Sequence, residues 1–221
     1  LTDRTVTVHD LSTGLQEGDF TQPAVATVST VASEAFAADV LLGKQVFYNA
    51  ADPRMGFGYI SCAACHQDGD DDGRTWDFTD RGEGLRNTTN LRGRAGMAQG
   101  NVHWSGNFDE IHDFDLDMVN AFGGTGFLSG SGGPNASIDA SNAGRNSELD
   151  ALAAYVASLG ASSIELSPHR NGDHSLTVAA SVGKQLFEGT LAPGSGDALS
   201  CMACHNPAAE FTDSTIGNNA G

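Results

Sequence analysis

A repeated pattern is the feature of this 221-residue chain that most constrains its fold. The segment GKQVF at 43–47 recurs as GKQLF at 183–187, and a C-x-x-C-H motif follows each copy. The step from Lys44 to Cys62 is 18 residues, and the step from Lys184 to Cys201 is 17. Self-similarity of this kind indicates one structural unit used twice. We therefore expect one complete unit and the opening part of a second.

Helical spacing of apolar residues appears at three places in the chain. Residues 33–50 place apolar side chains on one side, with Ser33 as a plausible N-cap. Residues 146–160 predict a strong helix that Asn146 or Ser147 caps and Gly160 ends. Residues 176–190 repeat the first of these patterns. The stretch from 51 to 145 is rich in Gly, Asp and Asn and predicts mostly loop.

The charge of the chain limits its partners. With 28 acidic and 11 basic residues, the net charge is −17 at pH 7. This balance argues against nucleic acid or an anionic membrane surface as a partner, and it suits proteins with basic surfaces. The sequence has no run of 18 apolar residues, so we expect no membrane span.

The two C-x-x-C-H motifs carry the chemistry. Their residues are Cys62, Cys65 and His66 in the first copy, and Cys201, Cys204 and His205 in the second. This is the signature of c-type haem attachment, because two thiols three residues apart can add to the two vinyl groups on one edge of a porphyrin. The next residue then offers an imidazole to the iron. The sequence therefore predicts two covalent haems.

Two other readings of the cysteines stay open. Each pair could be a redox dithiol, and all four cysteines could together hold zinc. Neither reading explains why a histidine follows directly after both pairs.

The segments around the first motif resemble a known family. Read in order, GKQVF, SCAACH, LRNTTNLRGRAG, VHWSGNFDEI and LDALAAYVASL resemble the repeating unit of di-haem cytochrome c peroxidases and of cytochrome domains fused to β-propellers. The resemblance covers roughly residues 34–160 and restarts at 176. It implies a mainly α fold with long loops, in which cytochrome c-like domains bind two covalent haems.

The resemblance also implies a distal ligand for the first haem. In the family unit, the residue three positions before a glycine supplies this ligand, and counting back from Gly106 gives His103. Ligation by His66 and His103 would favour the ferric state and a low reduction potential. Met97 is the alternative and would raise the potential. For His112 and Met118, helix-surface or core packing is the preferred interpretation, and packing beside Trp104 is the alternative for His103.

Several neighbouring residues have expected roles beside the haem. Arg86 and Arg92, with Arg94, could pair with the haem propionates or, equally, with the many aspartates. Trp104 resembles the tryptophan that lies between the haems of di-haem peroxidases, which would make it an electron conduit. Burial of its large ring against haem is the simpler explanation.

An acidic loop follows the first motif. Asp68, Asp70 and Asp72 have the opening spacing of a calcium loop, but Thr79 stands where such a loop has its glutamate. We expect a solvated acidic loop more than a calcium site.

The distal ligand of the second haem is unknown from the sequence. His103 follows His66 by 37 residues, and the same step from His205 passes residue 221. We therefore expect further polypeptide or a neighbouring subunit to complete this site. A fold-back of His9, His169 or His174 is the remaining alternative.

The domain organisation follows from these patterns. Residues 1–33 form a β-rich arm, in which 4–10 and 24–30 alternate around a turn at 12–19. We expect the first cytochrome c-like domain at 34–160, a linker at 161–175 and the truncated second unit at 176–221.

The preferred function is single-electron transfer by a di-haem c-type cytochrome, since an iron with two protein ligands has no place for substrate. The alternatives are a peroxidase-type enzyme, with Glu110 as its acid/base group, and a haem subunit or fragment of a larger redox assembly. Covalent haem attachment in the resembling proteins implies the periplasm or the cell exterior.

Overall fold

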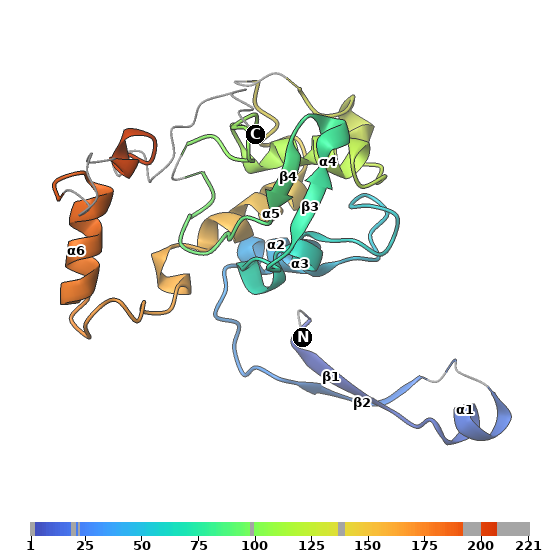
Figure 1. The fold of residues 1–221 in the computed structure, drawn as a ribbon. Helices are drawn as coiled ribbons and strands as arrows, with labels where there is room; N and C mark the ends of the chain where they lie inside the picture. Colours follow the sequence, from blue (N-terminus) through green and yellow to red (C-terminus); the bar gives the residue numbers. More distant parts are fainter. Residues whose placement is uncertain are drawn as a thin grey trace.

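The N-terminal arm is a two-stranded ribbon that projects from the rest of the molecule in the computed structural model, which describes residues 3–18, 21, 23–97, 100–136, 140–191 and 200–206 (Figure 1). Strands β1 (Thr5–His9) and β2 (Ala24–Ser29) pair antiparallel, as the alternating sequence predicts. Between them, residues 12–19 were expected to form a turn. They instead contain a short helix, α1 (Ser12–Glu17), which ends at Gly18.

The core of the molecule lies where α2 (Ala38–Tyr48) packs on α5 (Ser147–Ser158). Phe47, Leu149 and Leu152 are almost fully buried at this interface, together with Leu128 from the preceding loop. Burial of large apolar side chains is the dominant stabilising contribution in such a core. Both helices were predicted from the sequence, although α5 begins 99 residues after the end of α2.

The sequence indicated the start of α5 correctly but not the start of α2. The Asn146 side chain accepts hydrogen bonds from the backbone N–H groups of Glu148 and Leu149, which confirms it as the N-cap of α5. Ser33 is not the cap of α2, because that helix begins at Ala38 after an extended Ala37. The predicted N-cap was therefore four residues early.

The long connection between the two helices contains more regular structure than the sequence indicated. It holds α3 (Cys62–Cys65), the antiparallel hairpin of β3 (Thr75–Phe78) and β4 (Gly84–Asn87), and α4 (Asp115–Asn120). Short 3₁₀ turns lie in this connection at Gln67–Gly69, Thr79–Arg81, Ile111–Phe114 and Ser129–Ser131. Two more lie after α5, at Ala161–Ser163 and Cys201–Ala203. Met118 is part of the core, as its packing interpretation predicted.

The second unit is represented by one helix and one motif. Helix α6 (Val178–Phe187) begins at Thr177, whose side chain accepts a hydrogen bond from the backbone N–H of Ala180. Figure 1 shows α6 apart from α2 and α5. Within the described ranges, the molecule has no helix that is both long and apolar enough to cross a bilayer.

Candidate functional site

The two C-x-x-C-H motifs both form a single helical turn, an α-helical one at Cys62–Cys65 and a 3₁₀ one at Cys201–Ala203. In each, the histidine N–H donates to the carbonyl of the first cysteine, at 2.8 Å for His66 and Cys62 and at 2.9 Å for His205 and Cys201. An extended serine precedes each motif. One helical turn places residues three apart on the same side, so both thiols of a motif can reach one edge of a planar ligand.

The imidazole of the first motif is in the form that a metal ion requires. Burial lowers the pKa of His66 and keeps the ring neutral, although nearby backbone groups of Thr89 and Asp70 oppose this shift. Its Nδ1 atom is buried and has no hydrogen-bond partner among the described residues. A neutral histidine with an unsatisfied ring nitrogen fits the role of an iron ligand.

The thiols of the first motif do not resemble those of a redox dithiol. Burial raises the pKa of Cys62 to about 12 and also raises the pKa of Cys65, to which Asp72 contributes. Reactive dithiols have the opposite property, a lowered pKa that exposes a thiolate. Among the described residues, no three or more His, Cys, Asp or Glu side chains cluster as metal ligands would, so the four-cysteine zinc reading gains no support.

The predicted distal ligand, His103, is held in a confined position. Its side chain is only 6% exposed, and its ring stacks on Phe108 at 5.0 Å and lies 4.5 Å from the Trp104 ring. The backbone at His103 has a φ of 70°, which is uncommon outside glycine. Such a conformation persists only where the surroundings hold it in place, and it is frequent at functional sites.

The contacts of the two His103 ring nitrogens bear on which of them could bind a metal ion. Nδ1 lies 2.7 Å from the Asn107 side-chain oxygen, which accepts hydrogen bonds, so a proton on Nδ1 would satisfy this contact and leave Nε2 as the nitrogen for a metal ion. Nε2, however, lies 3.6 Å from a carboxylate oxygen of the buried Asp117. Iron ligation by Nε2 requires Asp117 to move aside, and the role of His103 stays a prediction.

One short segment connects the surroundings of the two predicted ligands. The Trp104 indole N–H donates to the backbone carbonyl of Asn87 at 2.9 Å, and Trp104 packs on Phe78 of the hairpin. Two residues further on, the backbone of Thr89 interacts with His66. The hairpin and the residues after β4 thus link the His66 and His103 regions. Whether Trp104 conducts electrons stays a prediction.

Arginines and aspartates of the site pair mainly with each other. The Arg92 guanidinium lies 3.2 Å from Asp70 and donates to the backbone carbonyl of Asp68. Arg86 of β4 lies 3.9 Å from the buried Glu83, which directly precedes that strand. These contacts match the aspartate-pairing alternative for Arg92, and propionate binding stays a prediction for both arginines.

The three aspartates of the acidic loop face different partners. Asp68 accepts a hydrogen bond from Tyr48 at 2.6 Å, Asp70 accepts one from Asn90, and Asp72 accepts one from Trp76 at 3.1 Å. Because their oxygens are not directed at one point, this arrangement does not support calcium, and the calcium site stays a prediction.

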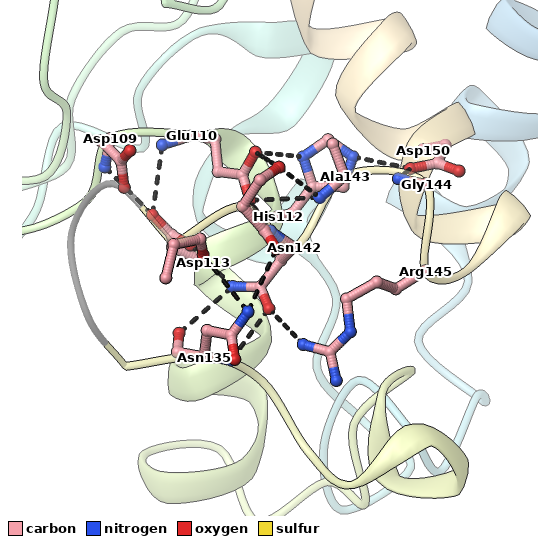
Figure 2. Close-up of polar contacts among 12 residues, drawn as sticks. Asp109, Glu110, His112, Asp113, Asn135, Asn142, Ala143, Gly144, Arg145 and Asp150 are labelled. Carbon is pink, nitrogen blue, oxygen red and sulfur yellow. Dashed lines mark hydrogen bonds and ion pairs between the residues drawn. The ribbon is translucent and has the colours of Figure 1, made fainter.

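Glu110 and His112 belong to a polar cluster that ties the 3₁₀ turn at Ile111–Phe114 to the start of α5 (Figure 2). The Glu110 carboxylate accepts hydrogen bonds from the backbone N–H groups of Asn142 and Ala143. His112 Nε2 lies 3.0 Å from Asp150. Both side chains therefore have a structural role, which agrees with the packing interpretation of His112.

A cavity of about 290 Å³ lies beside this cluster. Met97, Ala153, Ala157 and the buried His112 contribute to its walls. Pockets that enclose ligands of drug size begin at about 300 Å³, so this cavity is at the small end of that range. Met97 and His112 both line this cavity. His66 is not among its lining residues.

Sequence reasoning missed the charged and amide groups around His103. Glu83 lies 3.5 Å from His103 Nδ1, and the Ser105 hydroxyl contacts both Glu83 and Asn107. Asp117 lies on the opposite side of the ring. No signal in the sequence singles these residues out, because the chain has 28 acidic residues and these two come from distant segments.

The second motif has fewer described neighbours. Cys201 and Cys204 are exposed, and the His205 ring lies 6.4 Å from Phe187 of α6. The alternative ligands His9, His169 and His174 are all exposed residues of the arm and linker. The last residues of the predicted truncated unit, 207–221, lie outside the described part of the chain.

No protein-family model matches the chain, and no curated protein matches it. Among solved structures, the chain is similar to hydrazine synthase from Kuenenia stuttgartiensis, studied under 20 bar of xenon, with 27% sequence identity and a TM-score of 0.49. The match covers 83% of this chain and 54% of that chain, so it spans about half of the solved one.

Proposed function

We propose that this protein is a di-haem c-type cytochrome that transfers single electrons outside the cytoplasm, as part of a larger redox assembly. The observation that carries the proposal is the repeated C-x-x-C-H turn, with the same histidine-to-cysteine hydrogen bond in both copies. One match to a short motif is weak, but two matches at the same place in a repeated unit are specific.

The residues of the first motif fit a covalently attached haem. Cys62 and Cys65 are free thiols on one helical turn, and His66 offers a neutral, buried imidazole. In the second motif, Cys201, Cys204 and His205 would have the same roles. A bound haem supplies a one-electron ferric/ferrous couple. The buried aromatic rings around His103 would keep water from the first site.

Electron transfer is preferred to peroxide reduction because of the state of Glu110. An acid/base carboxylate must be free to exchange a proton with substrate. The Glu110 oxygens instead accept hydrogen bonds from two backbone N–H groups and the Ser141 hydroxyl. A carboxylate used in this way stabilises the loop and offers no free base.

The net charge of the chain and the exposure of the second motif support the proposed protein partners. The net charge of −17 would attract redox partners with basic surfaces. Cys201 and Cys204 are exposed among the described residues, which is compatible with a neighbouring subunit that contributes to the second haem site. The periplasm or cell exterior is proposed because covalent haem attachment in the resembling proteins takes place there.

Counting the haems tests the proposal. Intact mass and the pyridine haemochrome spectrum should give two covalent haems in the wild-type protein expressed with a haem-attachment system. The double variants Cys62→Ala/Cys65→Ala and Cys201→Ala/Cys204→Ala should each give one. A protein that carries no covalent haem would refute the proposal.

The ligands and the reaction class need separate measurements. A His66/His103 pair should give a low-spin electron paramagnetic resonance signal for the first haem, and His103→Met should raise its potential. His112→Gln is the matched control and should leave the potential unchanged. Peroxide turnover with a reduced small cytochrome as donor should be absent, and a rapid turnover would favour the enzyme instead.

A further inference from the structure

A closed loop holds the side chain of His103. The backbone N–H of Val102 donates to the carbonyl of Phe108 at 2.9 Å, so the residues between them form a tight loop. Within this loop, His103 has a φ of 70°. Its ring stacks on Phe108, and the Phe114 ring meets it edge-on at a centroid distance of 5.7 Å. Because the backbone and the neighbouring rings fix the imidazole, the groups beside its two nitrogens have defined positions as well.

Two acceptor oxygens face Nδ1 of His103. The Asn107 side-chain oxygen lies 2.7 Å from Nδ1, and a Glu83 carboxylate oxygen lies 3.5 Å from it. The Ser105 hydroxyl links these two oxygens, at 2.9 Å from Asn107 and 3.0 Å from Glu83. Neither an amide oxygen nor a carboxylate donates hydrogen bonds, so the arrangement favours a proton on Nδ1 and a lone pair on Nε2.

The Glu83 carboxylate is a buried charge that its neighbours compensate only in part. The side chain is 8% exposed, and its Oε2 atom has no hydrogen-bond partner among the described residues. Arg86 Nε lies 3.9 Å from this oxygen, which is too long for a hydrogen bond. In a site that is poor in water, a charge acts over several ångströms with little screening. The charge of Glu83 therefore acts on the imidazole and on a metal ion that the imidazole binds.

From these contacts we propose that Glu83 sets the reduction potential of the first haem by acting through the His103 imidazole. Glu83 is thus a positioning residue. An acceptor at Nδ1 orients the ring and makes Nε2 a stronger ligand, and a buried negative charge favours ferric over ferrous iron. Ligation at Nε2 requires Asp117 to move aside, but it leaves the Nδ1 side with Glu83 undisturbed. This inference rests on the proposed function and on His103 as the distal ligand.

Redox titration of the full chain with both haems attached tests the proposal. The Cys201→Ala/Cys204→Ala variant keeps only the first haem and therefore identifies which potential belongs to it. Glu83→Gln preserves the shape of the side chain and removes its charge. It should shift the ferric/ferrous equilibrium of the first haem at least tenfold toward the ferrous state, a rise of about 59 mV for one electron.

Asp80→Asn is the matched control. Asp80 is an exposed residue of the same hairpin turn, three residues before Glu83, so this variant also removes one negative charge there. Water and salt screen an exposed charge, and the equilibrium should change by less than about twofold. Asn107→Asp places an additional charge beside Nδ1 with almost the same shape, and it should shift the equilibrium toward the ferric state. Asn107→Asp keeps the proposal testable if Glu83→Gln does not fold.

Electron paramagnetic resonance checks the ligation, because the low-spin signal of the first haem should persist in all three variants. A Glu83→Gln potential equal to that of the wild type, an equally large shift in Asp80→Asn, or a rise in Asn107→Asp would each overturn the proposal. Loss of the low-spin signal in Glu83→Gln would overturn it too, since Glu83 would then be needed for ligation itself. An unchanged potential in a protein with two covalent haems refutes only this inference, whereas absence of covalent haem refutes the proposed function.

Discussion

Replacing each repeated glycine by alanine tests the packing in the structure directly. In Gly43→Ala, the new methyl group would overlap the Ala151 carbonyl oxygen, at a distance of 1.8 Å. The two helices must then separate, which loosens the contacts of the buried Val46 and Phe47. In Gly183→Ala, the methyl group enters open space and improves the helix propensity of α6.

The expected magnitudes are far apart. Overpacking and loosening of a core helix pair cost about 2–4 kcal/mol, even after the gain of about 1 kcal/mol in helix propensity. For a chain of this length, such a loss lowers the Tm by roughly 5–15 °C. Gly183→Ala should leave the Tm within about 2 °C of the wild type, because α6 adds little to the core.

Thermal unfolding followed by circular dichroism gives the comparison, with haem content matched between samples. Urea unfolding at pH 7 provides a second estimate of the free energy. Equal Tm values for Gly43→Ala and wild type would refute the α2–α5 packing described here. A large loss in Gly183→Ala would show that α6 packs against the chain itself.

Three other substitutions probe the links around the core. Arg54 lowers the pKa values of Asp52 and Glu148, so the stabilisation is present above a pH of about 4 and is lost as pH falls through the lowered values. Arg54→Met should therefore cost roughly 1–2 kcal/mol at pH 7 and clearly less at pH 3, and an equal cost at both would contradict the ion pair. Asn146→Ala should cost about 1 kcal/mol through the lost cap, while a stability equal to wild type would exclude that role. Asp115→Ala should cost about 2–4 kcal/mol in urea unfolding, because two buried backbone N–H groups lose their acceptor, and a loss below 1 kcal/mol would contradict those bonds.

The sequence predicted the parts of the fold whose signals are local. The apolar period of 146–160 and its Asn146 cap indicated α5 correctly, because helix capping and helix spacing involve neighbouring residues. The alternating arm likewise predicted β1 and β2. The β3–β4 hairpin was not predicted, because its strands have four residues each and lie in a stretch dominated by Gly and Asp.

The residues of the candidate site also divide into those that a local pattern predicts and those that only the fold brings together. The predicted attachment residues follow from spacing alone, since Cys62, Cys65 and His66 lie within one turn. The environment of His103 does not, because Glu83 and Asp117 approach it from opposite sides after long excursions of the chain. Three-dimensional proximity of such residues depends on loop conformations that no short pattern encodes. This is why the sequence could propose His103 as a ligand but could not indicate that a buried carboxylate faces its Nε2 atom.

The repeated unit separates what a short sequence determines from what its surroundings determine. The same Gly-Lys-Gln segment forms a helix in both copies, and both C-x-x-C-H motifs form a helical turn closed by the same histidine-to-cysteine hydrogen bond, so these local structures are encoded locally. Burial is not encoded locally, because Gly43 lies against α5 while a Cβ atom on Gly183 would have no neighbour within 4 Å among the described residues. The two copies therefore share their local structure and differ in the described residues that surround it.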